Sequence, residues 1–147
     1  MSHLPANHQL RGLYRTLAFL IAIGFVVLGV IGYLSTKDQS VFSRQPQRVL
    51  GLTVNPAFAV LVLAVGVVVL GGVLIGHNVD VRLNIAVGTA LLLIATVALA
   101  LLRTESNVLG FSVINVNVFY VAGLLLITAG LYSSTTPAVR TPSVSRN

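Results

Sequence analysis

Residues 57–76, AFAVLVLAVGVVVLGGVLIG, decide the fold, because these 20 consecutive positions contain no charged side chain. A hydrocarbon core of about 30 Å is crossed by about 20 helical residues at a rise of 1.5 Å each. The stretch therefore predicts a transmembrane helix, and three similar stretches occupy residues 16–34, 83–102 and 116–132. Strands of a membrane β-barrel alternate apolar and polar positions, so these almost continuously apolar runs exclude that architecture.

The composition of the whole chain agrees with four membrane spans. Of 147 residues, 56% are hydrophobic and only 8% are charged, with a mean hydropathy of +0.95 and no Cys. Soluble domains carry about 25% charged residues, and disordered chains combine high charge with low hydrophobicity. We expect an all-α integral membrane protein: an interfacial arm over residues 1–15, a four-helix bundle over 16–132, and a disordered tail over 133–147.

A short motif occurs twice, before the second and before the fourth predicted helix. VLGLTV occupies residues 49–54 and VLGFSV occupies residues 108–113, and Asn residues follow each copy. The chain is therefore interpreted as two repeated helical hairpins, with both motifs forming a shallow cap over one end of the bundle. Repeated halves occur in transporters, but a duplicated packing unit is the interpretation we favour.

These features carry a resemblance to a known family. The run from Val49 to Pro56, the glycines of the second span, and Asn115 and Asn117 resemble bacterial four-helix membrane proteins catalogued as domain-of-unknown-function family 4383. The resemblance covers roughly residues 13–132 and implies an architecture without an activity. In that family His residues commonly follow the Asn segments, whereas residues 57–61 and 118–121 contain none here. No metal or haem role is therefore carried over.

Groups that perform catalysis are scarce in this sequence. The four predicted spans contain no ionisable side chain, which argues against an ion or proton relay. His3 and His8 lie in the arm, and His77 stands three positions before Asp80 in a predicted turn over residues 77–82. That spacing is more typical of a turn than of a metal site. We expect no enzyme, no catalytic or metal residues, and no cofactor.

Uncharged polar residues within or next to the spans are the remaining candidates for chemistry. Such groups usually hydrogen-bond between helices, contributing about 0.6 kcal/mol on average. A ligand pocket between the hairpins is the less favoured alternative for some of them. The candidates are Asn84, Thr89, Asn115, Asn117 and Tyr120.

Small residues recur on every predicted helix. Because lipid tails are as apolar as Leu, membrane helices associate through close packing that small residues permit. Most of these positions are expected to pack within the bundle, while one glycine-rich face could dock a partner subunit. The candidates for packing or partner contact are Gly66, Gly72, Gly76, Gly123 and Gly130.

Basic residues give a formal net charge of +6, but they are scattered along the chain. Nucleic-acid binding requires a basic cluster on one face, so it is not expected. Arg11 and Arg15 directly precede the first span and are predicted to meet lipid headgroups. Their position favours cytoplasmic termini, and we expect the membrane to be a bacterial plasma membrane.

The function expected from these observations is that of a non-catalytic accessory subunit. It would pack against a larger membrane assembly of the respiratory or lipid-transport type, with lipids and other integral membrane subunits as partners. The alternative is a small membrane protein that binds a lipid or another hydrophobic molecule between its hairpins, near Asn115, Asn117 and Tyr120.

Overall fold

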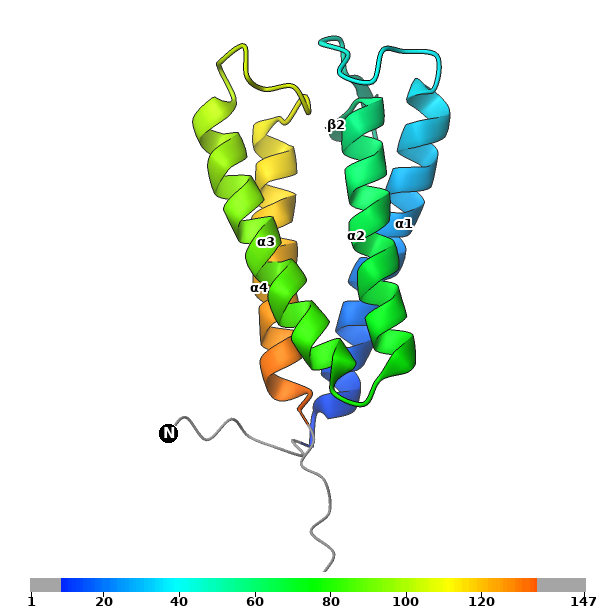
Figure 1. Cartoon of the computed structure of the whole chain (residues 1–147), viewed down its shortest axis with the longest axis vertical. Helices are drawn as coiled ribbons and strands as arrows, with labels where there is room; N and C mark the ends of the chain where they lie inside the picture. Colours follow the sequence, from blue (N-terminus) through cyan, green and yellow to red (C-terminus); the bar gives the residue numbers. More distant parts are fainter. Residues whose placement is uncertain (1–8, 135–147) are drawn as a thin grey trace, which may run out of the picture.

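Four long helices make up most of the computed structural model, which describes residues 9–134 (Figure 1). They are α1 (Arg11–Thr36), α2 (Pro56–Ile75), α3 (Val79–Leu101) and α4 (Val113–Tyr132), and two short strands, β1 (Gln47–Val49) and β2 (Leu52–Val54), precede α2. Each helix is long and apolar enough to cross a membrane, so the prediction of four helices of this kind is confirmed. Residues 1–8 of the predicted arm and 135–147 of the predicted tail lie outside the described residues.

The helices pack mainly as two pairs, α1 with α2 and α3 with α4. The start of α1, the end of α4 and the α2–α3 turn lie together at what we call the terminal end (Figure 1). The β1–β2 hairpin and the α3–α4 loop lie at the opposite, hairpin end, and the two pairs spread apart toward it. Contact between the pairs, α1 with α4 and α2 with α3, is much less extensive than contact within them.

Glycines bring the helices of each pair close together in the same way. A Cβ on Gly66 of α2 would lie 2.9 Å from the carbonyl oxygen of Ala22 in α1. A Cβ on Gly123 of α4 would lie 2.8 Å from the carbonyl oxygen of Gly88 in α3. Any side chain would force these backbones apart, so both contacts require glycine.

The helix ends differ from the sequence prediction. The structure starts α1 five residues before position 16, and α4 starts at Val113 rather than at 116. Hydropathy marks the apolar part of a helix, whereas its first residue depends on capping. The Asn55 side chain caps α2 by accepting a 2.8 Å hydrogen bond from the Phe58 amide, and Ser112 caps α4 in the same manner.

The α2–α3 turn is shorter than predicted. Gly76, His77 and Asn78 have φ angles of 66°, 51° and 62°, and these three left-handed residues reverse the chain. The prediction of a turn over 77–82 is wrong, because α3 already begins at Val79 and places Asp80 in its first turn. A carboxylate there is favoured by the positive end of the helix dipole.

The β1–β2 hairpin is a feature that the sequence did not predict. Its antiparallel register pairs Gln47 with Val54 and Val49 with Leu52. Leu50 and Gly51 form the turn with φ angles of 52° and 86°, the left-handed pair that tight hairpins require. Strands of three residues are too short to show a period of two in the sequence.

Four aromatic rings fill the core below the hairpin end. Phe58 and Phe111 meet edge to face with ring centroids 5.2 Å apart, and both contact Phe119. Phe25 of α1 packs against Phe119 at 6.0 Å. This cluster joins α1, α2, α4 and the α3–α4 loop where the two helix pairs spread apart.

Candidate functional site

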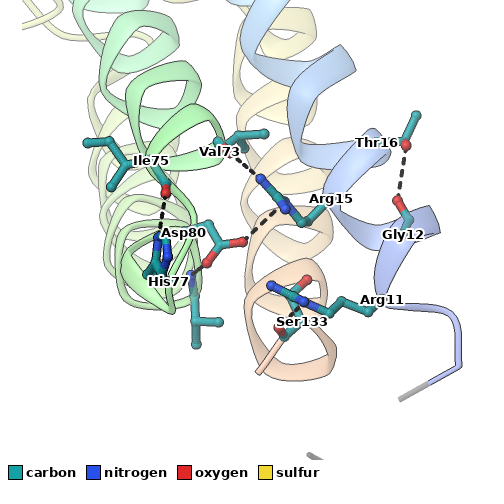
Figure 2. A network of polar contacts seen from close by, with 10 residues as sticks. Arg11, Gly12, Arg15, Thr16, Val73, Ile75, His77, Asp80 and Ser133 are labelled. Carbon is teal, nitrogen blue, oxygen red and sulfur yellow. Dashed lines mark hydrogen bonds and ion pairs between the residues drawn. The ribbon is translucent and has the colours of Figure 1, made fainter. Parts of the chain in front are cut away.

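A polar network occupies the terminal end of the bundle, with Arg15 at its centre (Figure 2). Arg15 Nη2 donates a 2.5 Å hydrogen bond to the carbonyl oxygen of Val73, in the last turn of α2. Its Nε lies 3.5 Å from Asp80 Oδ2, a charge contact that is too long for a hydrogen bond. The Asp80 side chain is 0% exposed and that of Arg15 is 36% exposed. Arg15 therefore connects α1 to both α2 and α3.

Arg11 makes a second connection from the first turn of α1. Its Nε donates a 3.1 Å hydrogen bond to the carbonyl oxygen of Ser133, just after α4 (Figure 2). The rings of Tyr14 and Tyr132 stack nearby with centroids 5.3 Å apart. A cation near the C-terminal carbonyls of a helix is stabilised by the helix dipole. Both arginines thus bind protein carbonyls, and their predicted contact with lipid headgroups stays a prediction.

The four predicted ranges contain no charged side chain, but the helices of the structure extend beyond these ranges and include charged groups at this end of the bundle. Arg11 and Arg15 lie within α1, and Asp80 is buried within α3. Helices continue past the apolar run that hydropathy detects, so charged residues at its margins become part of them. Asn84, one turn after Asp80, is also fully buried, and neither amide atom of its side chain is hydrogen-bonded within residues 9–134.

His77 does not take part in this network. Its Nδ1 lies 3.0 Å from the carbonyl oxygen of Ile75 (Figure 2). Asp80 instead contacts Arg15 and accepts a 3.0 Å hydrogen bond from the Val81 amide. In the described part of the chain, no group of three or more His, Cys, Asp or Glu side chains could hold a metal ion.

A second polar cluster joins the two VLG motifs at the hairpin end. Asn115 Oδ1 accepts hydrogen bonds from the Thr53 amide at 3.1 Å and from Ser112 Oγ at 2.7 Å. Asn115 Nδ2 donates a 2.6 Å bond back to the Thr53 carbonyl oxygen. The amide of Asn115 thus pairs with the backbone of β2 much as a neighbouring strand would.

Asn55 completes this cluster from the other side. Its Nδ2 donates to the carbonyl oxygen of Val108 at 2.9 Å, while Thr53 Oγ1 donates to that of Gly110 at 2.9 Å. We call Asn55, Thr53 and Asn115 the asparagine latch. Both asparagines are fully buried and hydrogen-bonded through both amide atoms, so the latch holds the helix pairs together rather than offering a binding site.

An apolar groove of about 540 Å³ runs between α1 and α4 below the β1–β2 hairpin. Its volume lies within the range of about 300–1,000 Å³ that is usual for ligand pockets. Asn117 is the one polar residue among the described residues that line it. The lining comprises Ile21, Gly24, Phe25 and Leu28 of α1, Leu50 and Leu52 of the hairpin, and Ile114, Asn117, Val118, Val121, Ala122 and Leu125 of α4.

The other polar candidates lie away from this groove. Asn115 belongs to the asparagine latch, and Tyr120 Oη lies 3.0 Å from Thr96 Oγ1, a contact between α4 and α3. Thr89 donates a 2.8 Å hydrogen bond to the Ile85 carbonyl oxygen of its own helix. The predicted group of Asn115, Asn117 and Tyr120 around one pocket is therefore wrong, because only Asn117 faces the groove.

All five candidate glycines lie against other parts of the chain. A Cβ on Gly72 or Gly130 would lie 2.8 Å or 2.6 Å from side-chain atoms of α3, as close as those at Gly66 and Gly123. Gly76 has a positive φ and faces Arg15. The glycines with open space around a Cβ are others, including Gly24 in the groove and Gly71 on α2.

Sequence reasoning missed Asp80, Asn55, Thr53 and Gly24 as important positions. Asn55 carried a local signal, since an Asn followed by Pro at a helix start is typical of a cap. Asp80 also carried one, because a carboxylate is favoured in the first turn of a helix. Thr53 and Gly24 had no local sequence signal, since their roles depend on residues in distant segments of the chain.

No family model, curated protein or solved structure matches this chain. The resemblance to domain-of-unknown-function family 4383 stays a prediction.

Proposed function

We propose that this protein is a non-catalytic, multi-pass membrane protein that binds the apolar chain of a lipid in the groove between α1 and α4. The observation that carries the proposal is the groove itself, which has eleven apolar lining residues and a single amide. Its walls are two helices that are long and apolar enough to span a membrane. In a bilayer, the surroundings of such a groove are acyl chains.

The length of the groove favours an acyl chain over a helix of another subunit. On α4 the lining extends from Ile114 to Leu125, about 16 Å at 1.5 Å per residue. Half of a hydrocarbon core of about 30 Å is about 15 Å. The groove therefore matches one leaflet, whereas a spanning helix would need a contact surface about twice as long.

The architecture that we propose for this function is a duplicated hairpin. Asn55 and Ser112 both cap a second helix, and Gly66 and Gly123 lie at the same distance from these caps. Most buried positions of α2 also coincide with buried positions of α4 under this alignment. In such a duplication, the groove lies at the interface between the two repeats, where repeat proteins of membranes commonly hold their ligands.

The placement that we propose is in a bacterial plasma membrane, with the terminal end in the cytoplasm. Arg11 and Arg15 at the start of α1 support this orientation through the positive-inside rule. A reporter fused after Asn147 tests it. Labelling of the reporter by an impermeant reagent in intact cells would reverse the orientation.

Lipid binding is tested by filling the groove with a larger side chain and comparing the lipid that the variants and the wild type retain after purification. Gly24→Leu places a side chain in open space within the groove, and Gly71→Leu is a matched control in open space outside it. Native mass spectrometry of the purified full chain is expected to show a retained lipid in the wild type and in Gly71→Leu, and its loss in Gly24→Leu. Equal lipid retention in all three proteins would refute the proposal.

The second function that we propose is that of an accessory subunit of a larger membrane complex. Gly71 supports it, because a Cβ added to this glycine would meet no atom of another described segment within 4 Å, and because it lies among the exposed apolar residues Val67, Val68 and Leu74 of α2. A small residue on an outward face permits close approach of another helix. Purification in a mild detergent is expected to recover stoichiometric partners that Gly71→Leu loses. A monodisperse monomer would contradict this function.

A further inference from the structure

Asn117 differs from the other asparagines of the hairpin end in having an unused amide. Asn55 and Asn115 are fully buried, and each is hydrogen-bonded through both amide atoms. Asn107 is hydrogen-bonded to the backbone of its own loop. Asn117 is exposed on the groove, and its side chain makes no hydrogen bond within residues 9–134. It is thus a free donor and acceptor on an otherwise apolar surface.

Asn117 lies in the part of the groove nearer the hairpin end. It lies four residues after the start of α4 at Val113, which is about 6 Å along the helix axis. The groove continues from Asn117 for eight more residues of α4, about 12 Å, to Leu125. A chain lying in the groove would therefore have its polar end beside Asn117 and its methyl end near the middle of the bilayer.

The chemistry of the groove indicates which polar end it accepts. An Asn side chain offers two N–H donors and one carbonyl acceptor. Among residues 9–134, no Lys, Arg, Asp or Glu lines the groove, so this lining offers no charge to a phosphate or an ammonium group. A carbonyl oxygen that approaches along the groove can accept a hydrogen bond from Asn117 Nδ2, and in hydrocarbon that amide otherwise lacks a partner.

We propose that Asn117 is the specificity-determining residue of the groove and that the groove selects acyl lipids by a hydrogen bond to the acyl carbonyl oxygen. The inference rests on the proposed lipid-binding function and adds the ligand class and the residue that recognises it. An alkyl chain of equal length without a carbonyl group fits the same apolar walls but leaves Asn117 unpaired.

The experiment compares how well an alkyl chain with a carbonyl group and an alkyl chain without one bind to the same protein. The full chain is purified in detergent and loaded with a fluorescent acyl probe, which is displaced by methyl palmitate or by hexadecane. Five proteins are compared: wild type, Asn117→Leu, Asn117→Gln, Thr89→Val and, with its groove filled, Gly24→Leu. Thr89 is a matched polar control, since it is exposed on α3 and bonds only to its own helix. Because all five share one detergent, partitioning of the ligands into micelles cancels when the ratio of ester to alkane displacement is compared between proteins.

Relative to Asn117→Leu, the wild type is expected to prefer the ester by about 3- to 20-fold, which is the range for a single polar contact in a membrane protein. Asn117→Leu is expected to remove this preference while the probe still binds. Asn117→Gln and Thr89→Val are expected to retain it. The same ratio of ester to alkane displacement in the wild type and in Asn117→Leu would overturn the inference while leaving chain binding intact. Absence of probe binding, or probe binding unaffected by Gly24→Leu, would instead refute the proposed function.

Discussion

Replacement of Arg15 by Met is expected to destabilise the bundle by about 3 kcal/mol. The change removes the only charged group that the structure places against Asp80 in the described residues, and that carboxylate is 0% exposed. It also removes the hydrogen bond to the carbonyl oxygen of Val73. Breaking a buried ion pair costs about 3–5 kcal/mol, because the remaining charge stays buried without compensation. We expect a cost at the lower end of this range of about 3–5 kcal/mol because Arg15 is itself 36% exposed, so water or lipid headgroups can enter the space that its side chain leaves.

The double variant Arg15→Met/Asp80→Asn separates the buried charge from the lost packing. It removes both charges, so more than half of the lost free energy of unfolding is expected to return. Arg44→Gln is a matched control, because Arg44 contacts Glu105 in an ion pair whose side chains are 73% and 85% exposed. Exposed ion pairs contribute about 0–1 kcal/mol, so this variant is expected to be nearly neutral.

The free energy of unfolding of all four proteins is measured by reversible denaturant titration in mixed micelles, followed by far-ultraviolet circular dichroism. The reasoning is refuted if Arg15→Met loses no more stability than Arg44→Gln. It is also refuted if the double variant is as unstable as Arg15→Met, because the loss would then come from packing rather than from an unpaired Asp80.

Three further predictions concern the latch and the helix contacts. Asn115→Leu leaves the partly buried N–H and C=O of Thr53 without their side-chain partner and is expected to cost about 2–4 kcal/mol, with faster hydrogen exchange at β2, whereas unchanged exchange would refute the latch. Gly123→Leu is expected to lower the free energy of unfolding by at least about 1–3 kcal/mol in an unfolding titration in micelles, because its Cβ would lie 2.8 Å from a backbone carbonyl oxygen. Gly71→Leu, the control, is expected to be neutral, and equal stabilities of the two variants would contradict this prediction. Tyr120→Phe removes one α3–α4 hydrogen bond and is expected to cost about 0.6 kcal/mol in the same titration, so a loss above about 2 kcal/mol would point to a different role.

The four helices were predictable because lipid imposes a simple requirement on the sequence. Each backbone polar group in hydrocarbon must be satisfied within its own helix, so an apolar run of about 20 residues has one stable solution. The ends of the helices were less predictable, since they depend on single side chains such as Asn55 and Ser112. Hydropathy likewise placed Asp80 in a turn, although three left-handed residues before it had already reversed the chain.

The candidate site was predictable only in part. The sequence identified Asn115 and Asn117 as polar groups in an apolar setting but gave them one shared pocket. Asn115 bonds to Thr53, 62 positions earlier in the chain, and nothing local reveals such a partner. The groove arises from the angle between the two helix pairs and from the β1–β2 hairpin above it, and both depend on long-range packing.

The three-residue turn between α2 and α3 limits how the two halves of the protein can move. Gly76, His77 and Asn78 leave almost no slack between the two helices, and Arg11 and Arg15 fasten the same end from α1. If the two helix pairs separate, they must therefore rotate about the terminal end, where the turn and the two arginines join them. Once the asparagine latch is broken, such a rotation would widen the groove most at the hairpin end, where Leu50 of the β1–β2 turn and Ile114 of α4 line it, so a lipid chain could enter sideways without unfolding any helix.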